Sequence, residues 1–196
     1  MALSSLEMEA LRLSLQVALW AIGVSLPLGI AMAWVLVRKT IPGRILLDGI
    51  VHLPLIVPPV VVGYLLLVIM GRRGLVGAWL WDTFQISIAF SWQGAAAAAG
   101  VMAFPLLVRS IRQELEAVDP KLEQAACTLG ARPFVVFVTV TLPLIVPGIL
   151  TGTILAFARC LGEFGATITF VSNIPGETQT LPLAIYTVLQ SPGGEA

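Results

Sequence analysis

Residues 13–37 read LSLQVALWAIGVSLPLGIAMAWVLV, and no charged side chain occurs among them. About 20 apolar residues in a helix are enough to cross the hydrocarbon core of a bilayer, so this run predicts a membrane-spanning helix. Three further runs of similar length contain no Asp, Glu, Lys or Arg, and they occupy residues 49–70, 83–108 and 133–158. The sequence therefore predicts an all-α, polytopic bundle of transmembrane helices that forms one domain over residues 1–196.

The composition of the whole chain favours the same solvent. Of the 196 residues, 58% are hydrophobic and 11% are charged, whereas a soluble domain carries about 25% charged residues. Because few polar side chains remain to cover a surface in water, we expect a multi-pass protein of the cell membrane, in contact with lipid. The formal net charge is zero, which argues against a nucleic-acid partner, since such proteins carry a basic excess.

The apolar pattern weakens after Arg159. Two uncharged runs follow, residues 164–176 and 178–194, but the second is interrupted by prolines. We interpret residues 164–190 as a broken or re-entrant helical segment beside a pathway, because irregular backbone at membrane depth is tolerated only where protein or water covers it. One ordinary fifth span with a kink is the open alternative.

The basic residues between the predicted spans indicate the orientation. Seven of them fall in the segments after the first and third spans, at Arg38, Lys39, Arg44, Arg109, Arg112, Lys121 and Arg132. Four fall on the other side, at Arg12, Arg72, Arg73 and Arg159. Because basic loops are retained in the cytoplasm, we predict that loop 109–132 is cytoplasmic and that the N-terminus lies outside.

A short amphipathic helix is predicted inside that loop, at about residues 120–130. Asp119 is a favourable N-cap, Pro120 suits the first helical position, and Gly130 suits the position just past the end. One face carries an apolar stripe at helical spacing, formed by Leu122, Ala125, Ala126 and Leu129. So short a helix is marginal alone in water, so it should dock either on its own membrane domain or on a second protein.

The same segment resembles a known signature. Residues 123–130 read EQAACTLG and residues 140–143 read VTLP, which is similar to the EAA loop of ABC importer permeases. Gln124 stands at the usual glutamate and Val140 at the usual isoleucine, and Glu123 lies one position early. In that family the segment is a coupling helix that fits a groove on the ATP-hydrolysing subunit. The resemblance implies that the coupling residues are Glu123, Gln124, Ala125, Ala126, Gly130, Leu142 and Pro143.

Two longer stretches extend the resemblance. Residues 52–74 read HLPLIVPPVVVGYLLLVIMGRRG and residues 159–180 read RCLGEFGATITFVSNIPGETQT. Both resemble the permeases of molybdate importers, and sulfate permeases fit residues 169–178 less well. The resemblance implies a type I ABC importer permease that moves molybdate, or tungstate, by alternating access, with a sulfate-type oxyanion permease as the alternative. Family members normally continue into a final transmembrane helix, which this sequence is expected to lack.

The resemblance also implies the assembly. The permease would be a homodimer that works with two copies of an ABC ATPase subunit and with an extracytoplasmic molybdate-binding protein. No catalytic residue, cofactor or metal is expected in the chain itself. The sequence has no GxxxxGK[ST] motif to hold ATP phosphates, so ATP hydrolysis should belong to the separate subunit.

Polar residues near the fourth span are candidates for the pathway or a gate. Arg159 and Glu163 are four residues apart and share a face on a continuous helix, where they form either a pathway element or a structural ion pair. Thr167, Thr169 and Ser172 follow with hydroxyl groups suited to brief contact with an anion.

A rival hypothesis is a membrane-embedded enzyme. It would use Asp48 to orient His52 as a general base, but no nucleophile motif accompanies this pair. A purely structural membrane anchor is a third possibility.

Overall fold

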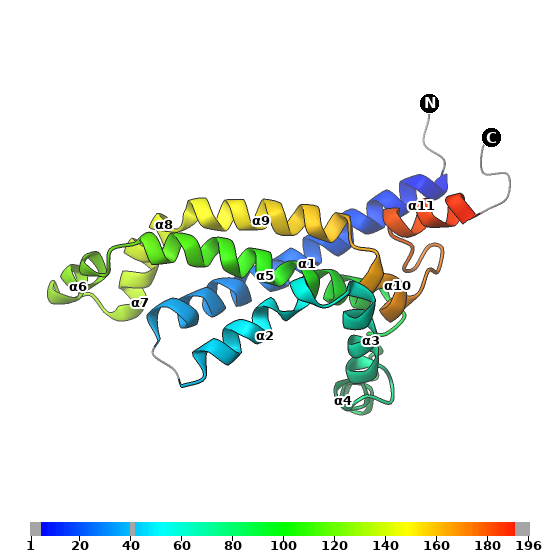
Figure 1. Cartoon of the computed structure of the whole chain (residues 1–196), viewed down its shortest axis with the longest axis horizontal. Coiled ribbons are helices and arrows are strands. Elements are labelled where there is room, and N and C mark those ends of the chain that lie inside the picture. Colours follow the sequence, from blue (N-terminus) through cyan, green and yellow to red (C-terminus); the bar gives the residue numbers. More distant parts are fainter. Residues whose placement is uncertain (1–4, 40–41, 191–196) are drawn as a thin grey trace.

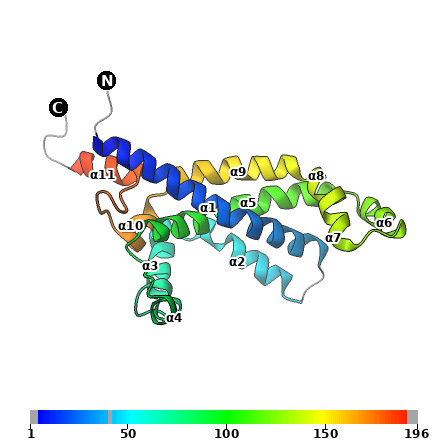
Figure 2. The same ribbon diagram turned by 180° about the vertical axis from the view of Figure 1, so that it is seen from behind.

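The computed structural model describes residues 5–39 and 42–190, and over these ranges its regular secondary structure is helical (Figures 1 and 2). Three long helices lie side by side: α1 (Ser5–Arg38), α5 (Trp92–Ala117) and α9 (Val146–Leu161). The shorter elements are α2 (Arg44–Ile56), α3 (Pro59–Met70), α4 (Leu75–Phe84), α6 (Pro120–Thr128), α7 (Pro133–Val136), the π-helical turn η1 (Phe137–Thr141), α8 (Leu142–Leu144), α10 (Gly165–Val171) and α11 (Leu181–Gln190).

Helix α5 lies at the centre because its first half is built from very small residues. Residues 94–100 read GAAAAAG, and Ala95, Ala98 and Ala99 are fully buried. Small side chains let helix backbones approach closely in a membrane bundle, and α5 packs against both α1 and α9. Ser91 caps its start, where the side-chain oxygen accepts the backbone N–H of Gly94 at 3.3 Å.

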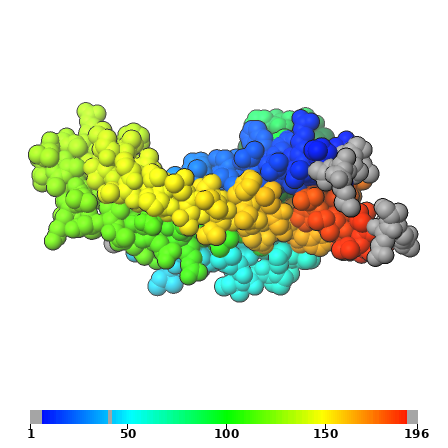
Figure 3. All heavy atoms as spheres, turned by 90° about the horizontal axis from the view of Figure 1, so that it is seen from above, coloured from blue at the N-terminus to red at the C-terminus, as the bar shows by residue number. Residues whose placement is uncertain are grey.

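Helix α9 meets α5 through two glycines one helical turn apart, Gly148 and Gly152. A Cβ added at Gly152 would lie 3.1 Å from the Cβ of Ser110 and 3.2 Å from Cδ1 of Leu107. Both contacts are tighter than ordinary van der Waals separation, so these glycines set the distance between the two helices. The other side of α9 runs along one surface of the molecule (Figure 3), where Leu150 and Ile154 are exposed.

The segment predicted as one span over residues 49–70 is not one straight helix. It consists of α2 and α3, which meet at a bend of 117°. Pro58 and Pro59 lie at the bend, and neither can donate a backbone N–H to continue the ladder of α2. As a result α3 projects away from the long helices, and α4 lies at its far end (Figure 1).

Two other predicted boundaries differ from the helices. Helix α5 begins at Trp92 instead of residue 83, because the chain between α4 and α5 is irregular and contains left-handed backbone at Gln85 and Phe90. Helix α5 also continues past Val108 to Ala117, so Arg112 lies on the helix and not in a loop. The run 133–158 is divided into α7, η1, α8 and α9, with a bend of 66° before Val146.

Residues 164–190 form two short helices, α10 and α11, separated by the irregular segment 172–180. Helix α10 packs on α3, and a Cβ at Gly63 would lie 2.9 Å from Cα of Ala166. Helix α11 is fastened to α1 where the Leu181 N–H donates to Oγ of Ser14 at 2.7 Å. Whether this segment is re-entrant or crosses the membrane as one kinked span stays a prediction.

The described helices are long and apolar enough for a membrane protein. Two of them, Glu7–Arg38 and Trp92–Ala117, qualify individually as spans, and there are up to four spans if each bent pair counts as one. Many large apolar side chains on the outer surface are exposed, including Leu19, Val24 and Leu28 on α1. In water such exposure would be costly, and in lipid it is the expected surface.

Candidate functional site

Helix α6 has well-formed caps at both ends, as the sequence indicates. Oδ1 of Asp119 accepts the backbone N–H of Lys121 at 2.9 Å, and Pro120 occupies the first turn. Gly130 has φ of +88°, and its N–H donates to the carbonyl of Cys127 at 3.0 Å. Together with the Ala131 N–H, which donates to the Ala126 carbonyl at 3.2 Å, this is a Schellman motif that ends the helix.

The apolar stripe of α6 is not used for packing within the chain. No residue of α6 is buried, Leu122 is 50% exposed, and Leu129 is 89% exposed. The helix lies at the end of the molecule opposite to α11 and the first turns of α1 (Figure 1). Of the two docking alternatives left open by the sequence, the described structure therefore leaves the stripe available to a second protein.

Glu123 lies on the other side of α6 and faces the chain's own bundle. Its carboxylate is 3.2 Å from Nε of Arg38, at the end of α1. It also accepts a hydrogen bond from Nη2 of Arg38 at 3.2 Å and one from Oγ1 of Thr141 at 2.8 Å. The sequence grouped Glu123 with the residues that face the ATPase, and nothing in the sequence indicated Arg38, 85 positions away, as its partner.

The remaining residues of the predicted coupling set occupy two places. Gln124, Ala125 and Gly130 are exposed on or just after α6, and Ala126 is half-buried. Leu142 and Pro143 lie in α8, beyond η1, where Leu142 packs against the buried core and its N–H donates to the Phe137 carbonyl. These last two residues shape the connection between α6 and α9 and do not belong to the exposed stripe.

Arg159 and Glu163 form an ion pair at the end of α9. Nη1 of Arg159 is 2.6 Å from Oε2 of Glu163, whose side chain is only 1% exposed. The other carboxylate oxygen accepts the Ala166 N–H at 2.8 Å. Glu163 therefore joins α9 to the start of α10, while the Arg159 side chain remains 28% exposed.

Of the three predicted hydroxyls, that of Thr167 contacts the backbone of Glu163. Oγ1 of Thr167 donates to the Phe164 carbonyl at 2.9 Å, and Oγ1 of Thr169 donates to the Gly165 carbonyl at 2.8 Å. Both threonines thus bond to their own backbone, and Ser172 lies exposed at the end of α10. Of the predicted pathway residues, the structure brings together Arg159, Glu163 and Thr167, whose Oγ1 also donates to the Glu163 carbonyl at 3.3 Å.

A second polar cluster joins α2 to α5 near the same end as Arg38. Oδ1 of Asp48 is 2.9 Å from Nη1 of Arg112 and 3.2 Å from Nδ1 of His52. Arg112 also pairs with Glu116 on its own helix at 2.8 Å. Asp48 is thus held by an arginine that the enzymatic hypothesis did not include, and the cluster attaches one helix to another.

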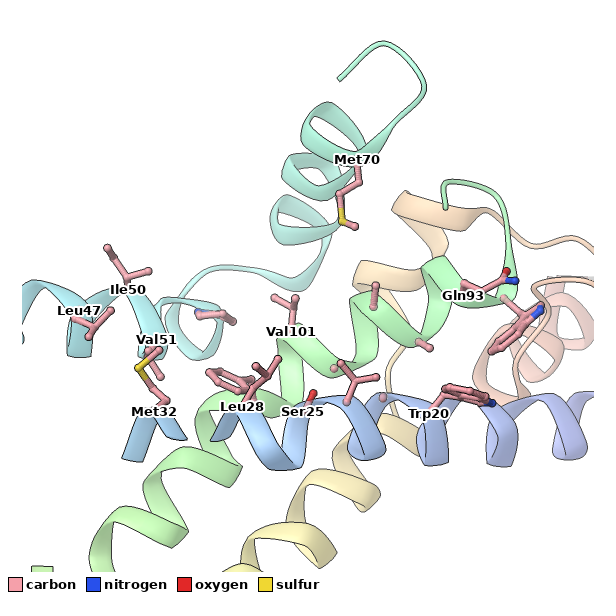
Figure 4. Close-up of a pocket in the computed structure, with 18 residues that line it drawn as sticks. Trp20, Ser25, Leu28, Met32, Leu47, Ile50, Val51, Met70, Gln93 and Val101 are labelled. Atoms are coloured by element: carbon pink, nitrogen blue, oxygen red, sulfur yellow. The ribbon is translucent and has the colours of Figure 1, made fainter. Parts of the chain in front are cut away.

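A groove of about 880 Å³ opens between α1, α2, α3 and α5. Sequence reasoning did not predict it. Its lining is apolar, with Met32, Met70 and Val101 among the side chains in Figure 4, while Ser25 and Gln93 supply polar atoms. No charged side chain lines this groove, so it lacks the chemistry that would hold an oxyanion.

Comparison with known proteins agrees with this geometry. Residues 25–191 match the family described as binding-protein-dependent transport system inner membrane component. The molybdenum transport system permease protein ModB of Escherichia coli (strain K12) is 64% identical over 196 residues, which cover 100% of this chain and 86% of that protein. ModB of Haemophilus influenzae is 58% identical, with 97% of this chain and 83% of that protein covered.

A more distant relative is named for the transport of another ion. The sulfate transport system permease protein CysT of Escherichia coli (strain K12) is 40% identical over 162 residues, which cover 83% of this chain and 58% of that protein. The family match extends over most of the chain, and the described helices are those of a multi-pass membrane protein. The chain therefore belongs to the family of inner membrane components of binding-protein-dependent transport systems, as a transport subunit and not an enzyme.

Proposed function

We propose that this chain is the permease subunit of an ATP-driven importer that carries molybdate, or the closely similar tungstate, across the cytoplasmic membrane. The observation that supports the transported ion is the likeness along the whole chain to permeases named for molybdenum transport, at 64% and 58% identity. The sulfate permease is both less similar and matched over less of its length. Molybdate is therefore a better candidate than sulfate.

The exposed stripe of α6 supports the coupling to an ATPase. A partner groove would bury Leu122 and Leu129, which the chain itself leaves exposed at 50% and 89%. Full burial of a leucine side chain contributes about 1.5–3 kcal/mol, so two of them suffice to anchor a short helix. In the proposed assembly two copies of the permease bind two ATPase subunits through their α6 helices.

The orientation follows from the same contact. If α6 binds a cytoplasmic ATPase, residues 109–132 are cytoplasmic and the N-terminus of α1, at the opposite end of the molecule (Figure 1), lies outside. Helices α3 and α4 then lie toward the outer side with Arg72 and Arg73, where an extracytoplasmic binding protein would deliver the ion.

We assign Arg159 to the transport path as the cationic side chain that would contact the ion. Its pairing with the buried Glu163 cancels most of its charge, which suits weak and reversible contact, because a conduit must release what it binds. Thr167, Thr169 and Ser172 stay proposed as secondary contacts. Their hydroxyls would have to leave their present backbone partners, or remain exposed as at Ser172, to meet an anion.

The test is reconstitution of the permease with its ATPase and binding protein in liposomes, followed by uptake of radiolabelled molybdate and sulfate. Leu129→Glu places a charge in the stripe and should weaken ATPase binding about tenfold or more, since it removes the burial of one leucine. Thr128→Glu adds the same charge beside the stripe and should change binding little. Equal binding by both variants would contradict the docking surface, and preferential uptake of sulfate would contradict the assigned ion.

A further inference from the structure

We propose that Arg38, Glu123 and Thr141 form a polar junction that passes the movement of α6 into the long helices, with Arg38 as the positioning residue. The inference deepens the proposed function, because it rests on α6 being the helix that the ATPase moves. It concerns how the chain receives that movement and not which ion is transported.

Helix α6 has few attachments to the rest of the chain. None of its residues is buried, so apolar packing cannot by itself make α6 and the bundle one rigid body. Among the described residues, the side-chain hydrogen bonds and ion pairs from α6 to other elements all end on the carboxylate of Glu123. A displacement of α6 therefore reaches the bundle through Glu123, through the contacts of α6 with α7 and η1, or through the chain at the two capped ends of the helix.

The guanidinium of Arg38 contacts two parts of the chain around α6. Its Nη2 donates to Oε1 of Glu123 at 3.2 Å, while Nε lies 3.2 Å from Oε2 as an ion-pair contact without a hydrogen bond. Nη2 also donates to the carbonyl of Val118 at 3.2 Å, just before the N-cap of α6. A planar guanidinium can hold two oxygens in a fixed direction, which the single ammonium of lysine cannot do. Arg38 thus fixes both the start and the inner face of α6.

The junction connects α6 to two of the long helices, α1 and α9. Arg38 ends α1, and Thr141 ends η1, which continues through α8 into α9. Both α1 and α9 pack against α5. A pull on one carboxylate is therefore delivered to two long helices at once, and η1 has the wide turn that often marks a functional site within a helix.

Burial makes the junction stiff. The side chains of Arg38 and Glu123 are 16% and 21% exposed, so little water can replace a lost partner. Removal of one charge would leave the other half-buried and unpaired, which is costlier than loss of an exposed surface pair. The two residues are thus expected to move together.

The test measures how many ATP molecules are hydrolysed per molybdate transported by the reconstituted complex. Glu123→Gln and Arg38→Lys should still bind the ATPase, but the ratio of ATP to molybdate should rise about tenfold, the effect of losing one charge-assisted hydrogen bond. Thr141→Val, which keeps the shape and loses one donor, should raise the ratio less. Glu116→Gln is the matched control, because Glu116 pairs with Arg112 at the same end without contacting α6.

A charge exchange, Arg38→Glu with Glu123→Arg, should recover part of the coupling lost in Arg38→Glu alone. An unchanged ratio of ATP to molybdate in Glu123→Gln, Arg38→Lys and Thr141→Val would overturn the proposed junction. Loss of ATPase binding in all three variants would also overturn it, because the residues would then only maintain the shape of α6. Failure of the unaltered complex to bind an ATPase or to transport molybdate would instead overturn the proposed function.

Discussion

The end of α6 provides a sharp prediction, because Gly130 is constrained by its backbone and not by its surroundings. Its φ is +88°, and no atom lies within 4 Å of the position that a Cβ would occupy. Gly130→Ala therefore introduces no clash and tests the left-handed conformation alone. For an L-residue that conformation costs about 1–2 kcal/mol.

The cost should appear as lost affinity for the ATPase. Because α6 is too short to be stable by itself, strain at its cap lowers the population of the shape that binds. A change of about 1–2 kcal/mol corresponds to about a 5- to 30-fold weaker apparent Kd. Gly130→Asn is the matched control, since asparagine visits the left-handed region more readily than alanine, and it should bind nearly as well as the unaltered chain.

The measurement is a titration of the permease in lipid nanodiscs with fluorescently labelled ATPase, for both variants side by side. Equal affinities of Gly130→Ala and the unaltered chain would refute the reasoning, since the cap would then be irrelevant to docking. Equal weakening by Gly130→Ala and Gly130→Asn would refute it differently, because the loss could not be assigned to φ.

Two further predictions concern packing and the rival activity. Gly152→Val should destabilise the contact between α9 and α5, because its Cβ would meet Ser110 and Leu107 at 3.1 and 3.2 Å. Thermal unfolding in detergent should show a lower Tm for this variant, whereas Gly23→Ala, with open space around it, should keep the Tm of the unaltered chain. Equal Tm values for the two variants would contradict the close glycine contact between α9 and α5. His52→Ala should leave molybdate uptake largely intact, because the contacts of His52 are with Asp48, whose side chain Arg112 already holds. Abolished transport at normal protein levels would contradict this.

Local signals predicted some elements well because they act within a few residues. The all-helical class followed from long uncharged runs, and both caps of α6 followed from Asp119, Pro120 and Gly130, whose side-chain and backbone preferences are satisfied by near neighbours. The run over residues 49–70 did not reveal the bend, because hydropathy reports how well a segment suits lipid and not the direction in which the chain runs. Lipid accepts the sequence whether or not the chain turns by 117° at Pro58.

The contacts of the site were harder to predict, because they join distant parts of the sequence. Glu123 could be placed on α6 by its spacing, but its direction depends on Arg38, and Asp48 likewise depends on Arg112, 64 positions away. The pair Arg159 and Glu163 was within reach because a four-residue spacing on one helix needs no tertiary information. That Glu163 also holds the start of α10 could not be predicted from that spacing.

The alanine face of α5 has a mechanical consequence. Methyl groups form shallow ridges, so a helix lying on them meets few obstacles when it slides by part of a turn, whereas interlocked leucines would have to change rotamer first. Shear between packed helices proceeds through such small displacements. The methyl-lined surface at the centre of this molecule is therefore suited to small sliding movements of α1 along α5 in which the two helices stay closely packed.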